Sequence, residues 1–408
     1  MENIFESYDY KYNGLNRKEI EDKLYAEIMD ALHKRYGASP DTQILKRVQE
    51  EWNAIQQADI VLDVAFMHEF ISWMREEKHP WKHMDCSCFI FYLLKISEGN
   101  PLPAHVYCPS CGKIKWYPEL PSGFDINFYT DEVDGDYIPY TYDFCECNEG
   151  LEGLICDGHN IAWQPFFYMD FIRYKGFTII VPIEMETEMV HFLQEHWLAE
   201  LDDAEPYYRR DDIRKINYSE IVFMFYLRRE EYSESFFEKE GDMKFKKDML
   251  SIWTSLVATK SEQEELYDKE LPIPRTFGEL IYTYGLFHCY GTWNELAQMM
   301  VRELNYSVAS LIVFKDDVFH YYLRHGGSEL DAWYGMEAAK FGNRMINIRE
   351  EMRWAHDKWV LEFFDKFESD EAGPLVLWSK GAVVERLLQN IRKYYYDLPK
   401  DQNEGMDE

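Results

Sequence analysis

Five of the eight cysteines in this chain have a spacing suited to binding a metal ion. Cys108 and Cys111 form a Cys-Pro-Ser-Cys-Gly turn that directs two thiolates at one point, and Cys145 and Cys147 follow after a gap of 33 residues. Two such pairs supply the four thiolates of a tetrahedral structural zinc site. Because the second pair has the spacing Cys-x-Cys, Cys156 could replace Cys145 or Cys147. A site closed by four thiolates has no position for water, so we expect it to stabilise the fold and not to catalyse.

Three acidic residues, Glu184, Glu186 and Glu188, could hold a hard cation. They alternate at the end of a strand-like segment, so an extended backbone would place the three carboxylates on one face. They are the candidate for a rebuilt catalytic metal site. The alternative is a water-facing edge that prevents unwanted strand pairing.

The acidic segment TDEVDGD contains Asp131, Asp134 and Asp136 and superficially resembles a calcium loop. Its spacing departs from the pattern of a calcium loop, and no glutamate stands at the distance required for a bidentate ligand. We therefore interpret it as a solvated turn.

Other groups that could do chemistry are interpreted as structural. Asp170 is a lone acid among aromatic residues, which favours a buried carboxylate with hydrogen-bond partners. Cys86 and Cys88 could be further zinc ligands, but they are interpreted as core residues near a turn. The side chains of His288 and Cys289 diverge in any regular structure because the two residues are adjacent, so they do not form a nucleophile–base pair.

The elements that position these residues follow from hydrophobic periodicity. Asn16 and Glu19 predict a capping box that begins a helix ending at Gly37, and Ser39-Pro40 predicts the start of a second helix. The further expectations are a buried strand running into a helix at 58–74, a strand or helix at 88–96, a loop-dominated metal module at 97–160, a strand at 176–185 and helices from 232 to 398.

The composition is that of a packed protein. Of the 408 residues, 46% are hydrophobic and 17% aromatic, which excludes an intrinsically disordered chain. The N-terminal residues lack the pattern of a secretory signal, and no apolar run approaches the length of a membrane span. Without secretion, the cysteines are expected to be reduced thiols or metal ligands, and the protein is expected to be cytoplasmic and outside the membrane.

The charge balance bears on the partner. Lys and Arg number 43 against 75 Asp and Glu, a formal net charge of −32. Binding to a nucleic-acid backbone requires cations that neutralise phosphates, so this balance disfavours DNA as a partner. The densest basic segments, at 207–215, 227–229 and 244–247, are short and have acids nearby.

Several short motifs, in this order, resemble the PolC-type alpha subunit of bacterial DNA polymerase III. The matching segments are RYG (35–37), FISWM (70–74), NPLPAHVYCPSCG (100–112), PSGFD (121–125), DGHNI (157–161), TFGELIYTYGLFH (276–288) and LIVFKDDVFHYYLRHG (311–326). The last two resemble the start of the fingers region. The resemblance covers roughly residues 20–390, with the middle third poorly matched, and it supports the zinc assignment.

The departures from that family concern catalysis. The resemblance implies a Gly/Ser-rich loop that cradles the incoming triphosphate, but MDCSCF (84–89) stands there without a glycine. It also implies an Asp-x-Asp pair on one strand and a third Asp on a later strand, which hold two metal ions. Those positions correspond to Gly176, Thr178 and Phe225, and none of these residues can replace a carboxylate.

We therefore expect an α+β, mainly helical protein with a degenerate polymerase palm-like part, a zinc-ribbon-like insertion and a helical fingers-like part. The expected parts are an N-terminal helical, palm-like part (1–96), the insertion (97–165), degenerate palm-like strands (166–230), the fingers-like part (231–398) and an acidic tail (399–408).

The predicted function is that of a catalytically inactive polymerase relative, which acts as a binding or regulatory module in DNA replication or related DNA transactions. A protein partner is expected, and DNA mimicry towards a DNA-binding protein is one form of it. The competing hypothesis is an active nucleotidyltransferase that uses Glu184, Glu186 and Glu188. A relic without retained activity is the third.

Overall fold

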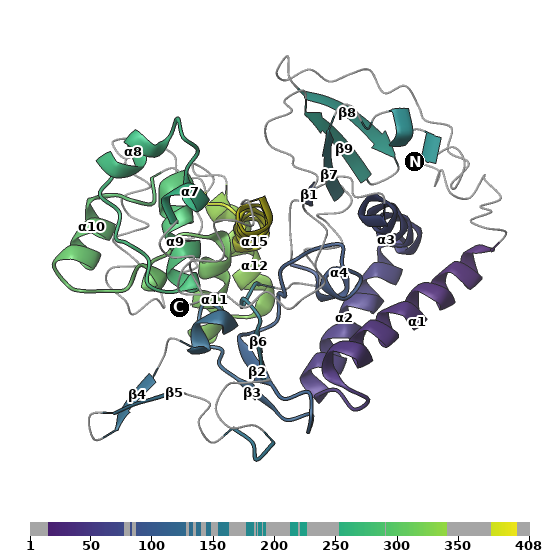
Figure 1. The fold of residues 1–408 in the computed structure, drawn as a ribbon, viewed down its shortest axis with the longest axis horizontal. Helices are drawn as coiled ribbons and strands as arrows, with labels where there is room; N and C mark the ends of the chain where they lie inside the picture. Colours follow the sequence, from purple (N-terminus) through teal and green to yellow (C-terminus); the bar gives the residue numbers. More distant parts are fainter. Residues whose placement is uncertain are drawn as a thin grey trace. The chain divides into compact units, whose positions relative to one another are not determined.

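The computed structural model describes residues 15–76, 82–83, 87–127, 130–133, 136–139, 144–147, 154–162, 177–182, 185, 187–189, 191–192, 213–218, 221–226, 253–289, 291–340 and 377–397. The chain divides into two compact units. The first unit consists of 1–98, 165–241 and 388–408, and the second of 99–164 and 242–387. Most of the described residues are helical and the sheets are small, which confirms the mainly helical α+β class (Figure 1). The five-part division stays a prediction.

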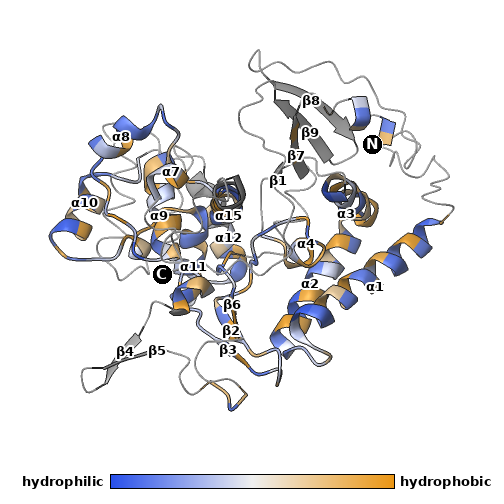
Figure 2. Cartoon of the chain, in the orientation of Figure 1, coloured by the Kyte–Doolittle hydropathy of each residue, from blue (hydrophilic) through white to orange (hydrophobic). Residues whose placement is uncertain are grey.

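The first unit begins with four helices. They are α1 (Arg17–Tyr36), α2 (Thr42–Gln57), α3 (Val61–Glu76) and the short α4 (Phe89–Leu93). The predicted capping box is confirmed, since the Asn16 side chain accepts a hydrogen bond from the Glu19 N–H and Glu19 accepts one from the Asn16 N–H. Gly37 ends α1 with a positive φ of 76°. Figure 2 shows hydrophilic and hydrophobic residues alternating along α1 and α2, as expected for helices with one buried face.

Two of the expected boundaries differ in the structure. The segment 58–74 was predicted as a strand running into a helix, but α3 is helical from Val61 onward and a turn precedes it. Its residues are buried on several sides, so the apolar run reflects a core helix and not a strand. The second helix begins at Thr42 and not at Pro40, because Asp41 caps it by accepting a hydrogen bond from the Gln43 N–H. The ambiguous segment 88–96 contains the helix α4.

The first unit also contains a four-stranded sheet in the order β1-β7-β9-β8. Its strands are β1 (Lys82–His83), β7 (Phe177–Pro182), β8 (Ile213–Tyr218) and β9 (Ile221–Tyr226). The two central strands, β7 and β9, run parallel, with Phe177 opposite Ile221 and Pro182 opposite Tyr226. The strand predicted at 176–185 is thus present but ends at Pro182.

A buried carboxylate connects α2 to the beginning of α4. Glu51 of α2 is fully buried. Its oxygens accept hydrogen bonds from the N–H groups of Phe89 (2.9 Å) and Ile90 (2.8 Å) and from the Cys88 thiol (3.1 Å). The Arg47 guanidinium, one turn earlier on α2, also donates to Glu51. The charge of the carboxylate is therefore neutralised and its oxygens are all used within the fold.

The second unit contains a three-stranded sheet in the order β3-β2-β6. Its strands are β2 (His105–Tyr107), β3 (Ile114–Trp116) and β6 (Ile155–Asp157), and all neighbouring pairs are antiparallel. A 3₁₀ helix, η2 (Gly123–Asn127), and a two-stranded ribbon, β4 (Thr130–Val133) with β5 (Asp136–Pro139), lie between β3 and β6 in the sequence. The loop-dominated module expected at 97–160 therefore has short strands at its centre.

The remainder of the second unit is helical. Its elements are α7 (Trp253–Val257), α8 (Gln263–Asp268), α9 (Phe277–His288), α10 (Glu295–Arg302), the 3₁₀ helix η7 (Val308–Ser310), α11 (Lys315–Arg324), α12 (Glu329–Lys340) and the start of α15 (Lys380–Asp397). The helices expected from 232 to 398 are interrupted where Pro272, Pro274, Gly326 and Gly327 stand, since these residues lie between helices. None of the helices in the described ranges is long and apolar enough to cross a membrane.

Three buried aspartates hold the beginnings of three of these helices. The Asp125 carboxylate accepts the Gly278 N–H of α9 at 3.0 and 3.1 Å. Asp316 accepts the Lys380 N–H of α15 at 2.7 Å. Carboxylates are favoured at helix N-termini, where unpaired N–H groups and the helix dipole attract negative charge.

The third aspartate, Asp317, lies in the first turn of its own helix, α11. It accepts the N–H groups of Val313 and Phe314 at 2.9 and 2.7 Å and the hydroxyl of Tyr282 on α9. Burial raises the pKa of Asp317 to about 6 despite these hydrogen bonds. Two adjacent acids of α11 therefore join this helix to its neighbours. Asp317 contacts Tyr282 of α9, and Asp316 contacts the first residue of α15.

Replacement of Glu51 tests whether this carboxylate organises the first unit. We expect Glu51→Gln to lower the free energy of unfolding by about 3 kcal/mol, because the Arg47 guanidinium then loses its buried counter-charge. Urea unfolding would measure this free energy. Glu50→Gln is the control, since Glu50 is a partly exposed neighbour that pairs with Lys46. Equal stability of the two variants would contradict the assignment.

Asp125 is expected to make stability depend on pH. Burial raises its pKa from 3.8 to about 7, against the hydrogen bonds to α9 and the charge of Lys380. The folded state thus holds the proton more tightly, so the stabilisation is present below pH 4 and is lost as pH rises to 7. Asp125→Asn cannot ionise. Its unfolding free energy relative to wild type should therefore rise between pH 4 and 7, by up to about 1.4 kcal/mol per pH unit.

The control for this measurement is the exposed Asp268→Asn. Urea unfolding at several pH values measures the free energy of unfolding of Asp125→Asn and of Asp268→Asn relative to wild type. If the difference between Asp125→Asn and wild type stays constant over this range, the buried carboxyl is not the titrating group.

Candidate metal centre

The first cysteine pair lies in the loop of the β2–β3 hairpin. Cys108 directly follows β2, and its N–H donates to the Lys113 carbonyl at 2.9 Å. The Gly112 N–H donates to the Cys108 carbonyl at 2.8 Å, which closes the turn. Gly112 has a φ of 74°, in the left-handed region that favours glycine. The turn is thus built by backbone bonds that leave both sulfurs directed to one side.

The second pair is brought to the first by the short segment 144–147. Phe144 is buried in the core of the module, and the Lys113 ammonium donates to its carbonyl and lies 5.4 Å from its ring centre. The core that supports both pairs consists of Ala104, Val106, Cys108, Tyr117, Leu120, Ile126, Phe144 and Leu154. Packing of Phe144 therefore positions Cys145 and Cys147.

The four sulfurs of Cys108, Cys111, Cys145 and Cys147 lie within 4.8 Å of one another. A tetrahedral site with Zn–S bonds of about 2.3 Å requires sulfurs about 3.8 Å apart, so the cluster is close to that geometry. Cys108 is buried, while Cys111 and Cys147 are exposed, which gives an ion a path of entry. Four convergent soft ligands could bind a thiophilic metal ion.

The electrostatics of the cluster also suit a cation. Burial raises the pKa of Cys108, but hydrogen bonds from the Cys111 N–H, from the thiols of Cys145 and Cys111, and from the Ser110 N–H lower it to about 7 overall. The pKa of Cys147 rises to about 12, first because of its hydrogen bond to Cys111, then because neighbouring atoms partly desolvate the sulfur and because the charges of Cys111, Cys108 and Cys145 oppose a further thiolate. One thiolate forms readily and opposes the next, so a bound cation would be needed to ionise all four.

Cys156 is not part of this cluster. It lies in β6 opposite Val106 of β2 and packs against the module core. Its sulfur is not among the four that lie close together. The alternative in which Cys156 replaces Cys145 or Cys147 is therefore not the arrangement found.

The three glutamates of the alternative catalytic site are not shown together. Glu184 and Glu186 lie outside the described residues. Glu188 is exposed in a helical turn of residues 187–189, after β7 has ended at Pro182. The extended backbone that would align three alternating carboxylates does not reach Glu188.

The acidic segment that resembles a calcium loop is partly described. Asp131 lies in β4 and Asp136 in β5, so the segment folds as a β-hairpin in which Val133 is opposite Asp136. Asp134 lies outside the described residues, as do Asp170 and Cys86.

Cys88 and His288 have partners within the fold. Cys88 is buried and donates to Glu51, as described above. His288 Nε2 lies 2.7 Å from the Val257 carbonyl, and its ring stacks on Trp378. Cys289 is buried and its pKa rises to about 12 through burial. The interpretation of these three residues as structural agrees with these contacts.

The motifs NPLP and DGHNI form one interlocked unit. The N–H groups of His159, Asn160 and Ile161 donate to the carbonyls of Asn100, Leu102 and Pro101 at 2.9 to 3.1 Å. The Asn100 amide donates to the Asp157 carboxylate at 2.8 Å. A Cβ atom at Gly158 would lie 2.3 Å from the Pro103 carbonyl oxygen, so the close approach requires glycine there. These motif residues build the scaffold beside the metal centre.

The sequence patterns missed two polar contacts of this scaffold. Ser122 Oγ lies 3.0 Å from His159 Nδ1, and burial lowers the pKa of His159 to about 4, so this imidazole is neutral. The Lys380 ammonium donates to the Pro121 carbonyl at 3.0 Å. The partners lie 37 and 259 residues apart, and no local spacing indicates either contact.

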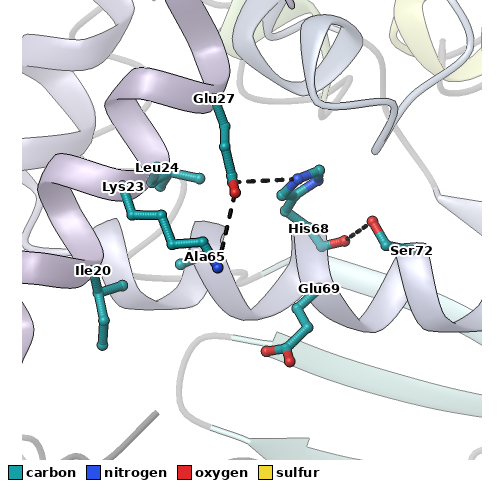
Figure 3. A pocket seen from close by; sticks show the side chains of 8 residues that line it. All are labelled: Ile20, Lys23, Leu24, Glu27, Ala65, His68, Glu69 and Ser72. Atoms are coloured by element: carbon teal, nitrogen blue, oxygen red, sulfur yellow. Dashed lines mark hydrogen bonds and ion pairs between the residues drawn. The ribbon is translucent and has the colours of Figure 1, made fainter. Parts of the chain in front are cut away.

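A cavity of about 160 Å³ lies between α1 and α3 of the first unit (Figure 3). His68 Nδ1 lies 3.0 Å from the Leu94 carbonyl, and His68 Nε2 lies 3.6 Å from Glu27. Glu69 points away from this pair, so its carboxylate does not converge with that of Glu27. None of the predicted site residues lines the cavity, and burial lowers the pKa of His68.

Comparison with known proteins finds two similar polymerases. The chain is 22% identical over 165 residues to a DNA polymerase III PolC-type of Ureaplasma parvum, a match that spans 40% of the chain and 10% of that protein. It is 33% identical over 69 residues to a DNA polymerase III PolC-type of Mycoplasma pneumoniae, which spans 17% of the chain and 5% of that protein. No protein-family model matches. The chain is thus distantly similar to PolC-type polymerases and spans a tenth or less of either one.

The cysteine cluster leads to a direct test. We expect the purified chain to bind one Co²⁺ ion with the absorption of tetrahedral thiolate ligation, and Cys147→Ser to weaken this binding by at least about tenfold, since one of four ligands is lost. Cys156→Ser is the matched control and should bind as the wild type does. Loss of Co²⁺ binding in Cys156→Ser, with retention in Cys147→Ser, would show that Cys156 is a ligand in place of Cys147.

Proposed function

We propose that this chain is a degenerate relative of PolC-type DNA polymerases, that it lacks polymerase activity, and that it acts as a binding or regulatory module in DNA replication or related DNA transactions. The distant similarity to two PolC-type polymerases supports the link to replication. The absence of the expected carboxylates supports the loss of catalysis.

One observation carries this proposal. The resemblance places an Asp-x-Asp pair at Gly176 and Thr178 and the third Asp at Phe225. Thr178 lies in β7 and Phe225 in β9, and these strands are adjacent and parallel. In their register Thr178 is opposite Val222 and Phe225 is opposite Val181, so the two positions are three residues apart along the strands and alternate in face. Neither threonine nor phenylalanine supplies a carboxylate for a catalytic metal ion. Gly176 lies outside the described residues.

The region of the expected nucleotide-binding loop supports the same conclusion. A phosphate-cradling loop offers unpaired backbone N–H groups to the ligand. The N–H groups of Phe89 and Ile90, at the end of the corresponding segment, instead donate to the Glu51 carboxylate. These two donors are used within the fold, so they are not available to a phosphate.

We assign zinc as the metal at the four cysteines, with a structural role. The donor set, four cysteine thiolates in two close pairs, is that of closed structural zinc sites. A bound Zn²⁺ would hold the β2–β3 hairpin against the segment of Cys145 and Cys147. With four protein ligands it would have no open position for a substrate.

The partner is proposed to be a protein. A formal net charge of −32 opposes approach to the phosphates of DNA, whereas it favours a protein with a cationic surface. Proteins that bind DNA have such surfaces, which is consistent with a place in DNA transactions.

A primer-extension assay tests the loss of catalysis. We expect no extension of a primed template with either Mg²⁺ or Mn²⁺ by folded protein whose zinc content has been measured, because the expected ligands of the catalytic metals are missing. A PolC-type polymerase serves as the positive control. Extension that disappears in Glu184→Ala or Glu186→Ala would contradict the proposal and support the rebuilt site that includes Glu188.

A further inference from the structure

Two of the four clustered cysteines are accessible to reagents in solution. Among the described cysteines, Cys111 and Cys147 are the two that are exposed, and the others are buried or half-buried. Oxidation of a cysteine is favoured where its sulfur is accessible and a second thiol lies beside it. The cluster therefore has an outer pair, Cys111 and Cys147, and an inner pair, Cys108 and Cys145.

The sulfurs of the outer pair lie close enough to react with each other. The thiols of Cys147 and Cys111 form a hydrogen bond, and all four sulfurs of the cluster lie within 4.8 Å of one another. A disulfide bond is about 2.05 Å long, so these two sulfurs need to approach by about 2.8 Å at most. Rotation of two exposed side chains about their Cα–Cβ bonds supplies a movement of this size.

The backbone on either side leaves room for that rotation. Cys111 lies in the loop of the β2–β3 hairpin, and a Cβ atom added at the next residue, Gly112, would meet none of the described atoms within 4 Å. The core of the module holds the buried residues Cys108 and Phe144. Each of these precedes an outer cysteine by three residues. Both segments are thus fixed at the core, while the outer sulfurs are exposed.

We propose that Cys111 and Cys147 form a peroxide-sensitive dithiol, whose oxidation to a disulfide expels the metal ion from the four-cysteine site. One thiolate of the pair attacks hydrogen peroxide, so that an S–O bond forms, the O–O bond breaks and hydroxide leaves. The second thiolate attacks the resulting sulfenic sulfur, the S–S bond forms and a second hydroxide leaves. Two protons from the solvent convert both hydroxides into water. The pair loses two electrons, and the peroxide gains them.

Oxidation of the outer pair leaves the inner pair, Cys108 and Cys145, as the remaining thiolate ligands. Because the thiolate is the form of cysteine that binds a metal, zinc then loses half of its ligands. The disulfide joins the hairpin loop to the segment of Cys147, so these two segments stay connected while the metal leaves. A thiol reductant reverses the step by exchange. This inference rests on the proposed zinc assignment and adds a form of regulation to that site.

The test treats the zinc-loaded full chain with one equivalent of hydrogen peroxide per zinc ion. A chromogenic chelator that leaves the reduced site loaded measures the zinc released, and peptide mapping by mass spectrometry identifies the disulfide. We expect one zinc ion to be released for each disulfide formed, and the disulfide to join Cys111 and Cys147. Dithiothreitol should restore the thiols and zinc binding. One equivalent of peroxide forms no more than one disulfide per chain, so the mapping identifies the pair that reacts first.

Cys156→Ser is the matched control, because Cys156 packs on the same module core but lies outside the cluster. This variant should release zinc to the same extent as the wild type. A first disulfide between any other two cysteines would overturn the proposal, as would zinc that stays bound after Cys111 and Cys147 are oxidised.

Failure of the zinc assignment gives a different result. A reduced chain that binds no zinc would contradict that assignment, and mapping of the metal-free chain would still show whether the outer pair reacts first. A zinc-loaded chain whose outer pair does not react first would contradict the present inference and leave the zinc assignment intact. The two proposals therefore fail separately.

Discussion

Buried carboxylates at helix N-termini are the constraint on which the second unit depends. Asp125, Asp316 and Asp317 each accept backbone N–H groups at the start of a different helix. An isolated carboxylate in such an environment would be costly, and the unpaired N–H groups of a buried helix end would be costly as well. The carboxylates and the N–H groups supply each other's hydrogen bonds. The first turns of α9, α11 and α15 are therefore fixed in relation to η2 and to one another. The remaining packing follows, because three helices whose first turns are fixed leave little freedom for their apolar faces.

The segments that resemble PolC-type polymerases are those that take part in this arrangement. PSGFD contributes Asp125, TFGEL contributes Gly278, and the segment that includes FKDD contributes Asp316 and Asp317. NPLP and DGHNI pair with each other through backbone hydrogen bonds. The likeness is thus concentrated in residues that hold the scaffold together.

Local sequence signals predicted much of this structure, and the limits of that prediction have physical causes. The capping box of Asn16 and Glu19 and the two close cysteine pairs are short-range patterns whose partners lie within a few residues, and both were found. The apolar run at 58–74 was predicted to begin as a strand, but α3 is helical. A helix that is buried on several sides has apolar residues on several faces, so its sequence does not show the spacing of an amphipathic helix. The choice among Cys145, Cys147 and Cys156 needed the positions of the sulfurs in the folded chain, where Cys156 lies outside the cluster. The contact between Asp125 and Gly278 joins residues 153 positions apart, which no local pattern reveals.

The four-cysteine cluster and the polar interior lie at opposite ends of one strand. Cys108 follows β2, and the NPLP segment that pairs with DGHNI precedes it, so β2 links the four-cysteine cluster to the interlocked motifs. Near this strand, four thiols converge on a position that could hold a metal ion, carboxylates hold helix ends and a neutral imidazole lies beside Ser122.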